Sequence, residues 1–115
     1  MPTLTEKTRN GEFLLSEANG SFSREVLTIA AAAPAMVSGT LLGRITASGK
    51  YTAYNNGAAD GTEVARGVLY TSVEDTAADQ KAVVIVRNAE VAAAKLTGSD
   101  TPGVADLLAI GVIVR

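Results

Sequence analysis

The segment TLLGRITASGKYTAY, residues 40–54, carries the clearest structural signal in the chain. Two runs rich in β-branched and aromatic residues, 40–47 and 50–54, flank the dipeptide Ser48-Gly49. A two-residue link that contains glycine is typical of a β-hairpin, because glycine adopts the positive φ that such turns require. The segment therefore predicts two antiparallel strands joined by a tight turn.

Strand signals continue on both sides of this hairpin. Residues 25–30 and 64–72 are short β-prone runs, and Gly67 in the second run indicates a bulge or a close approach between backbones. The unbroken apolar run at 82–86 is typical of a strand that is buried on both faces. Residues 89–96 fit either a helix or a strand followed by a turn.

One helix is expected near the C-terminus. Asp100 or Thr101 can cap its first turn, Pro102 suits the first helical position, and Gly111 is typical of a helix end. A short terminal strand follows at 112–114. The fold class is therefore mainly β, an α+β arrangement with a minor helix.

The composition limits the chemistry that the chain can perform. It has 115 residues, a net charge of −2, no cysteine and no histidine. The charge argues against neutralisation of nucleic-acid phosphates, and the missing residue types exclude disulfides, thiolate catalysis and imidazole catalysis. No apolar run approaches the ~20 residues that cross a bilayer. We therefore expect a soluble protein that is not an enzyme and has no cofactor, metal, small-molecule substrate, nucleic-acid partner or membrane partner.

The acidic loops leave one alternative open. Carboxylates are the only plausible catalytic groups, and those near Asp60 and Asp75 could serve a small enzyme or a carbohydrate-binding module. They lie in glycine- and alanine-rich segments, where aspartate is typically used for local hydrogen bonds. We favour solvated loops over an active site.

The N-terminal segment differs from the rest of the chain. Residues 1–24 are rich in polar residues and follow neither a helical nor a strand period for long, yet they hold both phenylalanines, Phe13 and Phe22. Tails without a partner are usually poorer in bulky apolar groups. We therefore predict a flexible N-terminal arm, residues 1–24, that becomes ordered on a partner, and a β-rich domain, residues 25–115.

Five stretches give the chain a family resemblance through their order and spacing. They are GEFLLSEANGSFSREVLTIA (11–30), APAM (33–36), GTLLGRITASGKYTAYNNGAADGTEVARGVLY (39–70), AVVIVRNAEV (82–91) and LAIGVIVR (108–115). In this order they resemble the head decoration protein D family of tailed bacteriophages, the family of the lambda protein. The resemblance runs from about residue 11 to the C-terminus.

The resemblance implies a structural virion protein. Such proteins form trimers on the outer surface of the expanded phage head, at local three-fold positions, and cement coat subunits against the pressure of packaged DNA. The implied partners are the major coat protein and further copies of the chain, and the protein is expected to be made in the host cytoplasm and to lie on the outer surface of the virion capsid. Another virion accessory protein, of a tail or fibre, is the alternative within this class.

The arm and the segment after the first strand supply the candidate capsid-binding residues. They are Phe13, Leu14, Leu15, Phe22, Arg24, Pro34 and Met36. We expect Phe13 on the coat protein and Phe22 at the edge of the domain. The hypothesis further expects that deletion of residues 1–24 leaves a folded domain that no longer binds heads.

Overall fold

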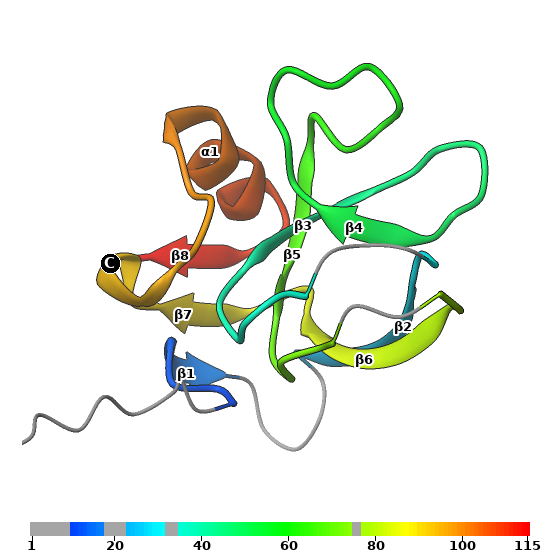
Figure 1. Cartoon of the computed structure of the whole chain (residues 1–115). Coiled ribbons are helices and arrows are strands. Elements are labelled where there is room, and N and C mark those ends of the chain that lie inside the picture. Colours follow the sequence, from blue (N-terminus) through cyan, green and yellow to red (C-terminus); the bar gives the residue numbers. More distant parts are fainter. Residues whose placement is uncertain (1–9, 18–22, 32–34, 75–76) are drawn as a thin grey trace, which may run out of the picture.

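A closed five-stranded barrel and a separate three-stranded sheet form the β structure of the computed structural model (Figure 1). The structure describes residues 10–17, 23–31, 35–74 and 77–115. The barrel strands are, in order, β2 (Arg24–Ile29), β4 (Tyr51–Ala53), β3 (Leu41–Arg44), β5 (Ala65–Leu69) and β6 (Gln80–Ile85). The sheet strands are β1 (Leu14–Glu17), β7 (Ala89–Val91) and β8 (Val112–Val114). The predicted mainly β fold class is confirmed.

The predicted hairpin is present as β3 and β4, which pair antiparallel with Leu42 opposite Ala53. Its turn is longer than the predicted two-residue link. Ile45 N donates to Lys50 O at 2.8 Å, and Gly49 N donates back to Ile45 O at 2.8 Å. Gly49 has the positive φ that the sequence indicates, +73°. The extra turn residues shorten both strands relative to the predicted runs.

Two hydrophobic clusters lie on opposite sides of the barrel wall. Neighbouring residues of one strand point to opposite faces, and accordingly Val84 belongs to one cluster and Ile85 to the other, both with 0% exposure. One cluster fills the barrel and includes Ile29, Leu42 and Leu69 from three further strands. The strand predicted at 82–86 is therefore buried on both faces, as expected.

The second cluster joins the barrel to the sheet and the helix. It combines Leu41, Val68 and Ile85 of the barrel with Val91, Val112 and Leu107. Figure 1 shows β1, β7 and β8 side by side at one flank of the barrel, with the helix α1 (Thr101–Ala109) next to β8. This layer covers one outer side of the barrel and makes barrel, sheet and helix one folded unit.

The C-terminal elements follow their sequence signals. Asp100 caps α1 by accepting a hydrogen bond from Gly103 N at 2.7 Å, Pro102 lies in the first turn, and Gly111 follows the helix with φ of +85°. The ambiguous segment 89–96 contains strand β7 and a single 3-10 turn, η1 (Ala93–Lys95). Within the described residues, no helix is long and apolar enough to span a bilayer.

The N-terminal residues 10–17 differ from the predicted arm. β1 pairs antiparallel with β7, and Phe13 is 1% exposed within the second cluster. The strand has four residues and a register irregularity between Leu14 and Ser16, so it leaves no alternation to recognise in the sequence. Residues 10–17 therefore belong to the folded domain. Residues 1–9 and 18–22, with Phe22, lie outside the described residues.

Candidate functional site

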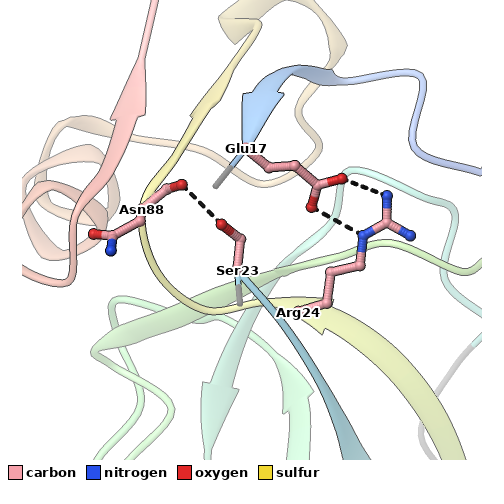
Figure 2. A network of polar contacts seen from close by, with 4 residues as sticks. All are labelled: Glu17, Ser23, Arg24 and Asn88. Atoms are coloured by element: carbon pink, nitrogen blue, oxygen red, sulfur yellow. Dashed lines mark hydrogen bonds and ion pairs between the residues drawn. The ribbon is translucent and has the colours of Figure 1, made fainter. Parts of the chain in front are cut away.

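Side chains at the end of β1 and at the start of β2 are bonded to each other and to the segment before β7. Arg24 donates from Nε to Glu17 Oε2 at 2.9 Å and from Nη2 to Glu17 Oε1 at 2.6 Å, a two-point ion pair (Figure 2). Ser23 Oγ donates to the backbone oxygen of Asn88 at 2.8 Å. Asn88 lies between β6 and β7 with φ of +46°. These bonds fix the end of β1 to the barrel strand β2, and the start of β2 to the segment before β7.

Arg24 is also packed against an aromatic ring. Its guanidinium carbon lies 4.1 Å from the centre of the Tyr70 ring, and Phe13 meets the same ring edge-on with 6.5 Å between centroids. The hydrogen bond to Glu17 raises the pKa of Arg24 above its ordinary value. Arg24 is therefore engaged by groups of its own chain, and Tyr70 links it to the buried Phe13.

The candidate capsid-binding residues fall into separate environments. Phe13 and Leu14 pack in or against the second cluster, and Met36 is 5% exposed in the barrel cluster. Leu15 is 54% exposed. Phe22 and Pro34 lie outside the described residues. The structure therefore links Phe13 and Arg24 through the Tyr70 ring, packs Leu14 against the second cluster, and leaves Leu15 exposed on β1.

A groove lies between the loop segments 35–37 and 72–74, next to Asn10, the first described residue of the chain. Met36 and Val73 form an isolated antiparallel bridge, with Met36 N donating to Val73 O at 2.9 Å and Val73 N donating to Met36 O at 2.8 Å. Beside this bridge the surface is hollowed by about 400 Å³. We call this hollow the Met36 groove, and its lining residues are Asn10, Ala35, Met36, Val37, Ser72, Val73 and Glu74.

The first described residues of the chain are anchored at this groove. Asn10 Oδ1 accepts a hydrogen bond from Ser72 N at 2.9 Å. Gly11 N donates to Ser38 Oγ at 2.8 Å and to Tyr70 O at 3.2 Å. Gly11 has φ of +74°, and a side chain there would meet the Tyr70 ring. The place where residues 1–9 join the domain is therefore fixed.

The acidic loops use their carboxylates within the fold. Asp60 Oδ1 accepts hydrogen bonds from Thr62 Oγ1 at 2.6 Å and from Thr62 N at 3.1 Å, which lower the pKa of Asp60. Asp79 pairs with Lys50 at 2.6 Å and accepts from Ala31 N at 2.8 Å, and the bond with Lys50 is the main reason that its pKa is lowered. These contacts agree with loop-forming roles. Asp75 lies outside the described residues.

Within the described parts of the chain, no three acidic, histidine or cysteine side chains are grouped closely enough to hold a metal ion.

Large apolar side chains are exposed on several different elements of the domain. Besides Leu15 they are Val26, Val37, Val64, Leu108 and Ile113. Sequence reasoning missed Val37 because it lies in a connecting segment without a strand or helix period.

Fold and loop contacts define a class: a small β-barrel protein whose acidic loops hold its own fold together. The family model described as bacteriophage lambda head decoration protein D matches residues 3–112. The chain belongs to this family, which confirms the predicted resemblance. Among curated proteins, none matches the chain. Membership supports a structural role, association with the phage capsid and a location on the virion.

Proposed function

We propose that the protein occupies the outer surface of the expanded phage head as a trimer, at local three-fold positions, and cements neighbouring coat subunits against the pressure of packaged DNA. The observation that carries this proposal is the family match over residues 3–112, nearly the whole chain. The protein would be made in the host cytoplasm and act on the virion, with the major coat protein and its own copies as partners.

In a trimer, three N-terminal segments that each bind the coat protein weakly can together hold the protein on the head. Ordering a chain segment costs ~1–2 kcal/mol of backbone entropy per residue, so one N-terminal segment binds weakly by itself. Three segments held at the spacing of the three-fold sites act at a high effective concentration, and avidity gains of ~10²–10⁴ become available. The same requirement for matched spacing would favour the expanded head over the unexpanded one.

The candidate contacts are divided by their accessibility. Leu15 is 54% exposed on β1 and can meet a coat subunit directly. Phe13 and Arg24 are held within the domain, so we assign them the indirect role of keeping β1 in place. Phe22, Pro34 and residues 1–9 stay candidates for direct contact, and Met36 contributes as the floor of the Met36 groove.

Co-sedimentation with purified heads tests the proposal. We expect the wild-type protein to pellet with expanded empty heads, to saturate them, and to stay in solution with unexpanded heads. A variant that lacks residues 1–9 retains β1, Phe13 and Arg24 and should bind the expanded heads much more weakly. Equal recovery of wild type on both kinds of head, or recovery on neither, would contradict the proposed function.

Deletion of residues 1–9 is a better test of the N-terminal segment than deletion of residues 1–24. Deletion of residues 1–24 would remove the buried Phe13, the whole of β1 and both Ser23 and Arg24. Loss of binding by that variant would then combine unfolding with loss of contact. Deletion of residues 1–9 keeps every described residue and isolates the contribution of the N-terminal segment.

A further inference from the structure

Among the residues that the structure describes, the lining of the Met36 groove combines apolar side chains with one charged side chain. Met36 and Val73 form its floor with 5% and 7% exposure, and Val37, at 45% exposure, forms an open apolar wall. Glu74 is exposed and is the one charged residue among the described lining residues. An occupant of this groove would therefore bury an apolar side chain and place a positive charge beside Glu74.

Hydrogen bonds hold the groove open without an occupant. The two backbone bonds between Met36 and Val73 fix the two loops against each other. Ser38 N donates to Ser72 Oγ at 2.9 Å, and Ser72 N donates to Asn10 Oδ1 at 2.9 Å. A preformed site loses less conformational entropy on binding than one that must order first.

The position of the groove limits its occupant. Residues 1–9, proposed to contact the coat protein, join the domain at Asn10, which lines the groove. An extended segment of nine residues reaches at most about 30 Å. A coat subunit that binds this segment therefore lies within reach of the groove.

The segment itself is the less favourable occupant. Leu4 is the large aliphatic residue of the segment 1–9 that could fill an apolar groove. If Leu4 occupied the groove, residues 5–9 would have to be held in one conformation. At ~1–2 kcal/mol of backbone entropy per residue, that cost exceeds the ~1.5–3 kcal/mol gained by burying one leucine.

We propose that the Met36 groove is a second coat-binding site, which receives an apolar side chain of the coat protein with a lysine or arginine beside it. This inference rests on the proposed function, and it names a contact that residues 1–9 do not provide. The apolar wall at Val37 and the charge of Glu74 are the two features that the coat subunit recognises.

Val37→Asp and Glu74→Lys test the two features, and Val26→Asp is the matched control. Val26 is an exposed valine on the barrel strand β2, at 63% exposure, outside the groove. We expect Val37→Asp to raise the protein concentration that half-saturates expanded heads by about tenfold or more. Glu74→Lys should raise it as well, while Val26→Asp stays within about twofold of wild type.

The outcomes separate the two proposals. Failure of the wild type to bind expanded heads refutes the proposed function. Wild-type binding together with normal binding by both groove variants overturns the groove assignment, and so does an equal loss in Val26→Asp. Thermal unfolding of each variant checks that the fold is kept, and Glu74→Lys decides the question if Val37→Asp does not fold.

The occupant itself can be identified by crosslinking. Because the chain has no cysteine, Val37→Cys carries a unique thiol to which a photoreactive label can be attached. On expanded heads we expect its adduct to join the coat protein, and the same label at Val26→Cys to give little coat adduct. An adduct with residues 1–9, with another copy of the chain, or with nothing while binding persists would overturn the coat assignment.

Discussion

Arg24 stabilises the fold through the shape of its guanidinium group as well as through its charge. Its guanidinium meets both oxygens of Glu17 and lies over the Tyr70 ring, a geometry that the lysine ammonium cannot reproduce. We expect Arg24→Lys to lower the free energy of unfolding by about 1 kcal/mol, measured by urea denaturation.

Arg87→Lys is the control for this substitution. Arg87 pairs with Glu25 at 2.6 Å, but both side chains are exposed, and exposed ion pairs contribute little. Its change in unfolding free energy should stay within about 0.5 kcal/mol. If Arg24→Lys costs no more than this control, the planar pairing and the ring contact do not stabilise the fold.

Gly43 is a second residue whose environment fixes its identity. A Cβ atom there would lie 2.6 Å from Thr62 Cα and 2.7 Å from Thr62 O, both backbone atoms. We expect Gly43→Ala to destabilise the fold by about 2 kcal/mol, because β3 must move away from that loop. Gly57→Ala is the comparison, since its Cβ would meet only Asn55 Oδ1 at 3.6 Å. Equal thermal unfolding of the two variants would argue against the close approach.

At the scale of elements, a buried tyrosine connects α1 to the barrel. Tyr54 Oη donates to Asp100 Oδ1 at 2.8 Å, the same oxygen that caps the helix through Gly103 N. Burial, followed by the hydrogen bond and charge of Asp100, raises the pKa of Tyr54 to about 12. The unfolded chain releases this proton near pH 10. Stability from Tyr54 is therefore present below about pH 10 and is lost as pH rises from there to about 12.

This difference predicts a specific alkaline loss of stability. We expect the unfolding free energy of wild type to fall more steeply between about pH 9.5 and pH 11.5 than that of Tyr54→Phe. Tyr51→Phe should lose as much as wild type, because Tyr54 remains. Equal losses in wild type and Tyr54→Phe, measured by urea denaturation at each pH, would show that this tyrosine does not titrate abnormally.

The buried side chain of Phe13 contributes more to the stability of the β1 region than the exposed side chains of the strand itself. Phe13 precedes the strand and is 1% exposed, whereas Leu15 within the strand is 54% exposed. We expect Phe13→Ala to lower the unfolding free energy by about 3 kcal/mol or more, and Leu15→Ala to change it by less than about 0.5 kcal/mol. Chemical denaturation checks both values. Similar small losses would mean that β1 does not contribute to the core as the structure indicates.

The sequence predicts those elements that are determined by residues close together in the chain, and it misses those that depend on distant residues. The hairpin, α1 and β6 each follow from neighbouring residues: a glycine turn, an N-cap with proline, and an unbroken apolar run. β1 could not be predicted because its partner is β7, more than seventy residues away. The Met36 groove has the same origin, since it forms where residues 35–37 meet residues 72–74.

At the scale of the whole molecule, the described part of the chain completes its own core. One cluster fills the barrel, the other joins barrel, sheet and helix, and within these residues every buried side-chain nitrogen or oxygen has a hydrogen-bond partner. The exposed large apolar side chains are distributed over β1, β2, two loops, α1 and β8. The protomer therefore has what it needs to fold before it meets other copies.

Because the core of the described residues is formed within one chain, we predict that folding does not require trimer formation. We expect the thermal unfolding midpoint to stay constant over about a hundredfold range of protein concentration, because unfolding coupled to dissociation would raise it with concentration. Sedimentation velocity of the free protein should then show a monomer at micromolar concentrations, with trimers forming on the head. Binding to expanded heads would consequently be cooperative in protein concentration. A midpoint that rises with concentration, or a trimer that persists on dilution, would instead place trimer formation before capsid binding.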